Sequence, residues 1–177
     1  MYAKTPPFHI PRAEVSARAA RVKLVLVDDD GTLTDGRVYY SARGEELKSY
    51  STRDAFAVQL LREAGIETAI VAAAASEITA RRAERLQLKH VFLGVSDKLT
   101  QLEKIEAATG VKRDAIACIG DDLDDYSLMK ELAKTGLVGV PADAIAPLHE
   151  LAHYVGDKPG GHGAVRGFAE WLLAWRR

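Results

Sequence analysis

Residues 22–34 read VKLVLVDDDGTLT, an almost continuous run of branched apolar side chains that stops abruptly at three aspartates and a glycine. The apolar part, Val22 to Val27, is too short for a helix and is typical of a strand buried on both faces. In open α/β sheets, ligands bind beyond the carboxyl ends of the strands. The junction at Asp28 is therefore the first place to look for chemistry.

Beyond this strand, short apolar runs alternate with amphipathic segments. We expect strands over 67–72, 91–93, 116–119, 137–140 and 154–155, and helices over 54–64, 77–86, 98–108, 124–133, 144–151 and 164–175. Ser76 stands at the N-cap of one expected helix, and Gly65 and Gly110 follow two others as C-terminal stops. The alternation predicts an α/β fold, a three-layer doubly wound and mostly parallel sheet with helices on both faces.

Two segments depart from this alternation. Residues 37–41 and 46–51 are β-prone and flank a turn at 42–45, which predicts a projecting β-hairpin. Residues 1–21 hold three prolines and an Ala- and Arg-rich stretch. We expect an N-terminal leader over 1–21, a short helix or an extended segment, and one domain over 22–177.

The composition excludes several classes of protein. Lys and Arg number 24 against 25 Asp and Glu, so nothing favours a nucleic-acid partner. No apolar run approaches the ~18 residues of a membrane span, and no signal peptide is apparent. The single cysteine, Cys118, lies in an apolar run and is expected in the core. We expect a cytoplasmic protein without a membrane or nucleic-acid partner.

Acidic clusters follow two of the expected buried strands. Asp28, Asp29 and Asp30 follow the first, and the run GDDLDD at 120–125 follows the strand over 116–119. Carboxylates gathered at the edge of a low-dielectric core destabilise the fold unless a cation neutralises them. Oxygen ligands in this number suit Mg²⁺, which we expect as the cofactor.

The spacing of the first cluster indicates a division of roles. In an extended strand end, Asp28 and Asp30 point to one side and Asp29 to the other. One same-side carboxylate can attack phosphorus while the other transfers protons to and from the reacting oxygens. Turn capping by Asp28–Asp30 and an acidic helix start at 121–125 are the alternatives for each cluster alone. Their joint occurrence after two strands favours a site.

These strings resemble a known family. VDDDGTLTDG resembles the first motif of haloacid dehalogenase-like phosphatases, GDDLDD resembles the fourth, and SDKL supplies a lysine, Lys98, where the third motif has one. The resemblance implies a Rossmann-like haloacid dehalogenase fold acting on a small phosphorylated substrate. The roles that it implies are Asp28 as nucleophile, Asp30 as acid/base, Lys98 as neutraliser of phosphoryl charge, Asp28, Asp30 (by its backbone carbonyl) and Asp121 as metal ligands, and Asp122 or Asp125 as support.

The resemblance narrows to the 3-deoxy-D-manno-octulosonate 8-phosphate phosphatase branch. The hairpin after the first motif, the absence of an inserted cap domain, STRD at 51–54 and GGHGAVR at 160–166 carry this likeness. It implies a homotetramer formed through the hairpins, with the glycine-rich tail reaching a neighbouring active site. Arg53 and Arg166 are the implied ligands of an anionic substrate, since guanidinium groups suit carboxylates and phosphates.

The sequence departs from the family at two places. The second motif normally ends its strand with a threonine or serine, but the matching stretch is IVAAAAS, with Ala72 at the hydroxyl position; Ser76, the nearest hydroxyl, is better explained as an N-cap. Ala55 and Ala57 stand where the branch generally has glycines. These departures predict reduced activity and leave two alternatives to a sugar phosphatase. One is a subunit of a larger enzyme acting on an aryl phosphate, similar to the delta subunit of phenylphosphate carboxylases, and the other is a non-catalytic metal-binding homologue.

Overall fold

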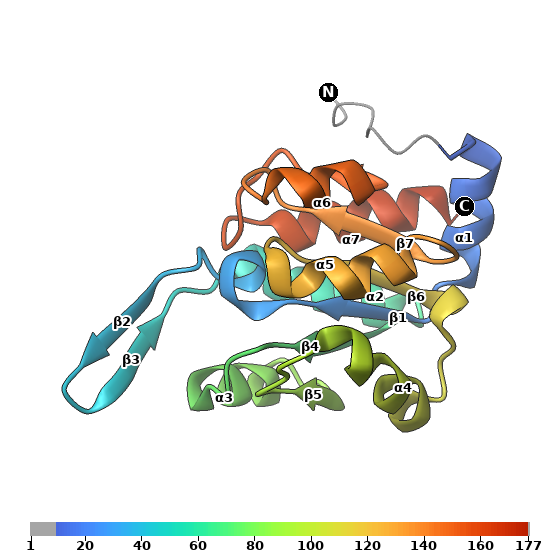
Figure 1. The fold of residues 1–177 in the computed structure, drawn as a ribbon. Coiled ribbons are helices and arrows are strands. Elements are labelled where there is room, and N and C mark those ends of the chain that lie inside the picture. The colour runs from blue at the N-terminus through green and yellow to red at the C-terminus, as the bar shows by residue number, and fades with distance from the viewer. Residues whose placement is uncertain (1–9, 177) are drawn as a thin grey trace.

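The computed structural model describes residues 10–176, which form a parallel sheet between two layers of helices (Figure 1). The sheet has six strands in the order β5-β4-β1-β6-β7-β8, and every neighbouring pair is parallel. The chain runs outward from β1 to both edges, so the doubly wound sheet is confirmed. The strands are β1 (Leu24–Val27), β4 (Glu67–Val71), β5 (His90–Phe92), β6 (Ile116–Ile119), β7 (Leu137–Val140) and β8 (Tyr154–Val155).

Helices cover both faces of the sheet because the residues of the central strands are apolar on both sides. Val25 of β1 belongs to one buried cluster together with Phe168. Its neighbour in the strand, Leu24, belongs to a second cluster together with Leu128. No helix within residues 10–176 has the length and apolar character needed to cross a membrane. The helices are α1 (Arg12–Arg21), α2 (Thr52–Glu63), α3 (Glu77–Arg85), α4 (Lys98–Thr109), α5 (Leu123–Leu132), α6 (Ala146–Leu151) and α7 (Ala164–Trp175).

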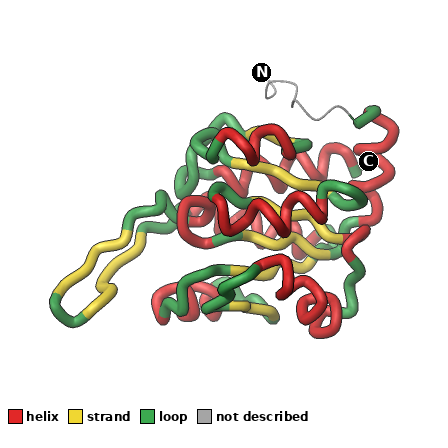
Figure 2. Tube along the Cα trace, viewed as in Figure 1, coloured by secondary structure: helices red, strands yellow, loops and turns green. Residues whose placement is uncertain are grey.

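The predicted hairpin is present and projects from the body of the molecule (Figure 2). Its strands, β2 (Val38–Ser41) and β3 (Gly44–Lys48), pair with each other in a separate antiparallel sheet. Between β1 and α2 the chain forms a short helical segment, Asp29–Leu33, and then this hairpin. Tyr39, Tyr40 and Leu47 leave 58%, 72% and 63% of their surface exposed on it. The hairpin therefore offers apolar surface outside the core.

The stretch expected as a leader contributes a helix to the fold. Residues 1–9 lie outside the described part of the chain, but α1 packs against α7 and buries Val15 and Ala19 in the core. Arg18 is buried with them, and its Nη1 donates hydrogen bonds of 2.9 Å to the carbonyl oxygens of Ala133 and Gly136. The helix is thus tied to the loop that precedes β7.

Candidate active site

The two acidic loops meet at the carboxyl edge of the sheet. Val27, the last residue of β1, pairs in register with Ile119, the last residue of β6, so the residues that follow emerge side by side. Carboxylate oxygens of Asp28, Asp121 and Asp125 all lie within 4.8 Å of one another. The parallel register therefore unites the two clusters that are far apart in the sequence.

Close backbone approach makes this arrangement possible. A Cβ atom on Gly31, whose φ is +99°, would lie 2.0 Å from Oδ2 of Asp121, and a Cβ atom on Gly120 would lie 2.3 Å from the carboxylate of Asp125. The hydroxyl of Thr32 also donates a hydrogen bond of 2.8 Å to Oδ1 of Asp121. Glycine is thus required at Gly31 for the two loops to approach each other, and at Gly120 for the Asp125 carboxylate to pack against its own loop.

Lys98 lies at the centre of the carboxylates. It is the first residue of α4, yet only 2% of its surface is exposed, because its ammonium group lies among the carboxylates that follow β1 and β6. Its Nζ donates to Asp28 and, at 2.7 Å, to Asp125, and it lies 2.8 Å from Asp124. Lys98 is therefore a buried cation of the site and not an exposed lysine at the start of a helix.

The electrostatics of this cluster call for additional positive charge. Burial, together with the neighbouring Asp125, raises the pKa of Asp28 well above its usual value although Lys98 opposes the shift. Burial is also the main cause that raises the pKa of Asp121 to about 7. One ammonium group thus does not balance the carboxylates around it, and their clustered oxygens have the chemistry and spacing that suit a hard cation such as Mg²⁺.

The remaining residues of the second cluster serve the start of α5. Oδ2 of Asp125 accepts a hydrogen bond of 2.9 Å from the backbone N–H of Asp121, which holds this loop beneath the carboxylates. Asp122 is exposed, and its Oδ1 accepts from the N–H of Leu123 as the N-cap. Of the two residues expected to support the site, Asp125 lies in it and Asp122 lies at the helix end.

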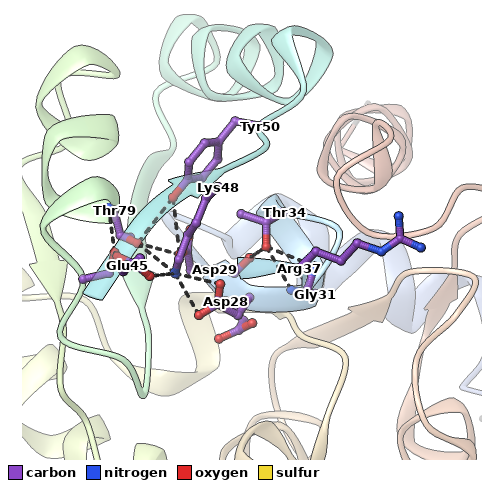
Figure 3. A network of polar contacts seen from close by, with 12 residues as sticks. Asp28, Asp29, Gly31, Thr34, Arg37, Glu45, Lys48, Tyr50 and Thr79 are labelled. Carbon is purple, nitrogen blue, oxygen red and sulfur yellow. Dashed lines mark hydrogen bonds and ion pairs between the residues drawn. The ribbon is translucent and has the colours of Figure 1, made fainter. Parts of the chain in front are cut away.

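The chain leaves the strand directly after Asp28, so the simple alternation of side chains does not continue. Asp29 is fully buried, as expected for the residue facing away, and it pairs with Lys48 of β3 (Figure 3). Asp30 pairs with the same ammonium group. Around it, Thr79 donates a hydrogen bond of 2.6 Å to Asp29, and the hydroxyl of Tyr50 lies 3.4 Å from the same oxygen. Sequence reasoning missed Lys48, Tyr50 and Thr79, because nothing in their local pattern distinguishes them from surface residues.

One buried carboxylate, that of Asp54, joins the chain beside Arg53 to the chain beside Arg166. Asp54 is 1% exposed and accepts hydrogen bonds from the backbone N–H groups of Gly163, at 3.2 Å, and Arg166, at 2.8 Å. The Arg53 side chain is exposed beside Gly163, and Nε of Arg166 donates 2.7 Å to Glu170. The two predicted substrate ligands therefore lie at the amino ends of two helices, Arg53 on α2 and Arg166 on α7. The Arg166 side chain is paired with Glu170 of its own helix.

The glycine-rich tail lies against the first acidic loop of its own chain. The N–H of Gly161 donates 3.1 Å to the carbonyl oxygen of Thr32, and a Cβ atom on Gly160 would overlap the carbonyl of Gly31. The N–H of Gly160 also donates to Asp143. Two tight glycine contacts therefore hold this segment at the site of its own subunit, and its reach to a neighbouring active site stays a prediction.

The altered second motif lies at the end of β4. Ala72 is buried there, and Ser76 caps α3 by accepting a hydrogen bond from the N–H of Thr79. The Ser76 hydroxyl also donates to Glu45 of the hairpin. The N-cap explanation of Ser76 is confirmed, and its hydroxyl is occupied by a partner outside the carboxylate cluster.

Comparisons with known proteins agree with this fold. The 3-deoxy-D-manno-octulosonate 8-phosphate phosphatase of Yersinia pestis is 36% identical over 160 residues, which cover 90% of this chain and 84% of that protein. Two solved structures superpose closely. The phosphatase of Moraxella catarrhalis in complex with magnesium ion, phosphate ion and a KDO molecule has a TM-score of 0.85 and 32% identity, covering 92% of each chain. The cobalt-bound phosphatase of Haemophilus influenzae has a TM-score of 0.84 and 33% identity, covering 90% of this chain and 91% of that one.

No family model matches the chain. The identity to the Yersinia pestis protein nevertheless extends over nearly the whole of both sequences, and the solved structures share the sheet and the helices. The chain therefore belongs to the haloacid dehalogenase-like hydrolases and, within them, to the 3-deoxy-D-manno-octulosonate 8-phosphate phosphatase family.

Proposed function

We propose that this protein is a magnesium-dependent phosphomonoesterase that works through an aspartyl-phosphate intermediate. The observation that carries the proposal is the buried ammonium of Lys98 among the carboxylates at the ends of β1 and β6. The carboxylates outnumber this ammonium group, which favours a divalent metal ion, and the ion and Lys98 together would offer positive charge to a phosphate dianion. Such a site suits phosphoryl transfer, in which catalysis consists mainly of positioning and charge stabilisation.

Asp28, Asp121 and the backbone carbonyl of Asp30 would hold the Mg²⁺. The clustered oxygens of Asp28 and Asp121 support this assignment, and the raised pKa values of both groups favour a cation at this place. The magnesium and cobalt ions in the two related phosphatases support a divalent ion as the cofactor. When bound, the ion supplies positive charge for the phosphoryl oxygens and orients the substrate.

The reaction assigned to these residues has two displacements. An oxygen of Asp28 attacks phosphorus, the bond between phosphorus and the leaving oxygen breaks, and Asp30 in its acid form gives its proton to that oxygen. Water then attacks the phosphorus of the aspartyl phosphate and gives a proton to Asp30, which releases inorganic phosphate and restores Asp28. Lys98, which contacts Asp28, stabilises the negative charge on the transferring phosphoryl group.

The substrate that we assign is a small anionic sugar phosphate related to 3-deoxy-D-manno-octulosonate 8-phosphate. The activity named for the Yersinia pestis relative supports this class, and Arg53 and Arg166 would bind the anionic part of the molecule. An aryl phosphate is the second candidate, because Phe56 leaves 59% of its surface exposed beside Ala55 on α2 and would suit an apolar ring.

We also propose that the protein assembles as a homotetramer through its hairpins. The exposed side chains of Tyr39, Tyr40 and Leu47 support this, since exposed apolar surface on a projecting element commonly marks a protein interface. Light scattering coupled to size-exclusion chromatography tests it. A Tyr40→Ser, Leu47→Ser variant should elute as a smaller species, and a wild-type monomer at micromolar concentration contradicts the assembly.

The function is tested by phosphate release from a panel of sugar, aryl and alkyl phosphates with and without Mg²⁺. We expect turnover of at least one substrate that requires Mg²⁺ and falls on the order of 10⁴-fold in Asp28→Asn. Asp114→Asn, a change at an exposed carboxylate in the short helix before β6, is the matched control and should leave the rate unchanged. Absence of turnover for every substrate favours the non-catalytic alternative, and preference for aryl phosphates favours the second candidate.

A further inference from the structure

Lys48 reaches from the base of the hairpin into the acidic loop that follows β1 (Figure 3). Its side chain is fully shielded from solvent, and its Nζ lies 2.9 Å from Oδ2 of Asp29 and 2.7 and 2.8 Å from the two carboxylate oxygens of Asp30. Burial alone lowers the pKa of a lysine, but the hydrogen bonds to Asp30 and Asp29 raise the pKa of Lys48 above its usual value. The residue is therefore a fixed cation at the end of β3.

Asp30 depends on this cation for its orientation. Its side chain is 34% exposed, so packing leaves the carboxylate free to turn towards solvent. Within residues 10–176, Lys48 is the only side chain that makes a hydrogen bond or ion pair with the Asp30 carboxylate. The contact with both oxygens opposes rotation of the carboxylate and confines it to the side of the loop that faces β3.

Lys48 itself is held from several sides. Thr79 of α3 lies 3.4 Å from Nζ, and Glu45 lies 3.6 Å away on the same strand. Asp29 is in turn fixed by Thr79 and Tyr50, so the ammonium has a rigid frame drawn from the loop after β1, the hairpin and α3. An ammonium group fixed in this way can hold the partly exposed Asp30 carboxylate in one orientation.

We propose that Lys48 is a positioning residue that holds the Asp30 side chain in the orientation from which its acid form protonates the leaving oxygen. The inference rests on the proposed phosphomonoesterase function, in which Asp30 is the acid and base. It makes the hairpin part of the catalytic apparatus of its own subunit, because β3 carries the residue that aims the acid. The alternative is a purely structural role, in which Lys48 only neutralises the buried Asp29.

The dependence of the rate on the leaving group separates these two roles. An alkoxide is a poor leaving group that needs a proton as its bond to phosphorus breaks, whereas 4-nitrophenolate leaves without one. The ratio kcat/KM covers the steps up to that bond cleavage and excludes hydrolysis of the aspartyl phosphate. Loss of Asp30 positioning therefore lowers kcat/KM for alkyl phosphates selectively, and a general disturbance of the site lowers it for both kinds of substrate.

The experiment compares Lys48→Met with the wild type on 4-nitrophenyl phosphate and on the best sugar phosphate of the panel. We expect kcat/KM for the sugar phosphate to fall about 10²-fold, the lower end of what acid catalysis contributes, and that for 4-nitrophenyl phosphate to change by less than about threefold. Lys89→Met removes an exposed lysine paired with Glu67 and should change neither value. Equal losses on both substrates, or no loss on either, overturn the proposal.

Two further measurements keep the inference testable if the single variant fails to fold or no substrate is turned over. The double variant Lys48→Met, Asp29→Asn removes the buried carboxylate together with its partner, and the same selective loss is expected in it. Crystal structures of the wild type and of whichever variant folds should show the Asp30 side chain turned to a new rotamer while Asp28, Lys98 and Asp121 keep their places. An unchanged Asp30 rotamer overturns the proposal, whereas a wild type that hydrolyses no phosphate overturns the proposed function instead.

Discussion

Lys98 shows how much of this site is decided by single side chains. Moving an ammonium group out of water costs several kcal/mol unless ion pairs and hydrogen bonds replace its hydration. Lys98 meets this requirement through Asp28, Asp124 and Asp125, which come from the ends of two strands that are distant in the sequence. The lysine therefore stabilises the carboxylates around it and depends on them for its own burial.

Ala72 stands where the family resemblance predicts a hydroxyl, and restoring that hydroxyl tests whether its absence reduces activity. Ala72→Thr places a hydroxyl at the end of β4, and we expect kcat on the best substrate to rise by about tenfold to 10²-fold, because one preorganised donor to a transferring group is worth that much or more. Steady-state kinetics at saturating Mg²⁺ measures the change.

The control for this substitution is Ala107→Thr, the same change at an exposed position of α4. It should leave kcat unaltered, which separates a hydroxyl at the site from a general effect of threonine. An Ala72→Thr protein that folds with the wild-type midpoint of thermal unfolding and shows an equal or lower kcat would mean that Ala72 is not a defect in this chain.

The helices α2 and α7 illustrate how elements are held at the site. Their amino ends meet at the Asp54 carboxylate, which supplies acceptors for N–H groups at the beginning of α7 that have no partner within the helix. The same contact fixes the tail segment that covers the loop after β1. One buried side chain thus keeps two helices and the glycine-rich segment together.

Removal of this carboxylate should destabilise the protein more than removal of an ordinary helix cap. We expect Asp54→Ala to lower the free energy of unfolding by about 2–3 kcal/mol, because two buried N–H groups lose a charged acceptor. Asp97→Ala removes the exposed N-cap of α4 and should cost about 1 kcal/mol. Urea unfolding followed by circular dichroism measures both values, and equal losses in the two variants would refute the special role of Asp54.

The charge balance of the whole molecule links its stability to the metal. Without a cation, burial and repulsion from Asp125 disfavour the ionised forms of Asp28 and Asp121, so we expect Asp121→Asn to be more stable than the wild type in chelator. Added Mg²⁺ should stabilise the wild type by about 1.4 kcal/mol for each tenfold excess over its Kd, and should stabilise the variant little. Thermal unfolding in EDTA and in a Mg²⁺ series gives both comparisons, and an equal metal response in the two proteins would remove Asp121 from the ligand set.

The buried His153, which precedes β8 and is influenced by Arg18 of α1, makes the stability of the fold sensitive to acid. Burial, with a smaller contribution from Arg18, lowers the pKa of His153 from 6.5 to about 4. The imidazole of His153 therefore binds a proton more readily in the unfolded chain than in the folded one. Its contribution to the free energy of unfolding is complete above pH 6.5 and is lost as the pH falls towards 4. Between pH 7 and pH 5 the loss amounts to about 2 kcal/mol.

The variant His153→Asn isolates this effect, because asparagine keeps an acceptor for the N–H of Val138, which now donates 3.0 Å to Nδ1 of His153. Denaturant unfolding at several pH values should show that the wild type loses about 2 kcal/mol more than the variant between pH 7 and pH 5. Parallel pH curves for the two proteins would show that His153 does not carry a proton-linked cost.

The order of the elements and much of the site follow from local pattern. The strands β6 and β8 and the helix α7 have the boundaries expected from the sequence, because apolar period and turn residues act over a few positions. The helix α2 begins at Thr52, two residues before the expected start, because the Ser51 side chain caps the N–H of Arg53. The motifs around Asp28, Lys98 and Asp121 were recognisable because each has a distinctive string of neighbours.

Only the folded chain decided which distant residues support these motifs. Lys48 and Thr79 belong to a hairpin and a helix whose local sequence carries no mark of the site, yet both contact Asp29. The tail containing Gly160 folds back onto the loop at Gly31 of its own subunit, a contact that depends on the docking of α7 against α2. Local pattern specifies elements and motifs because it acts along the chain, whereas these partners are chosen by packing between segments far apart in sequence.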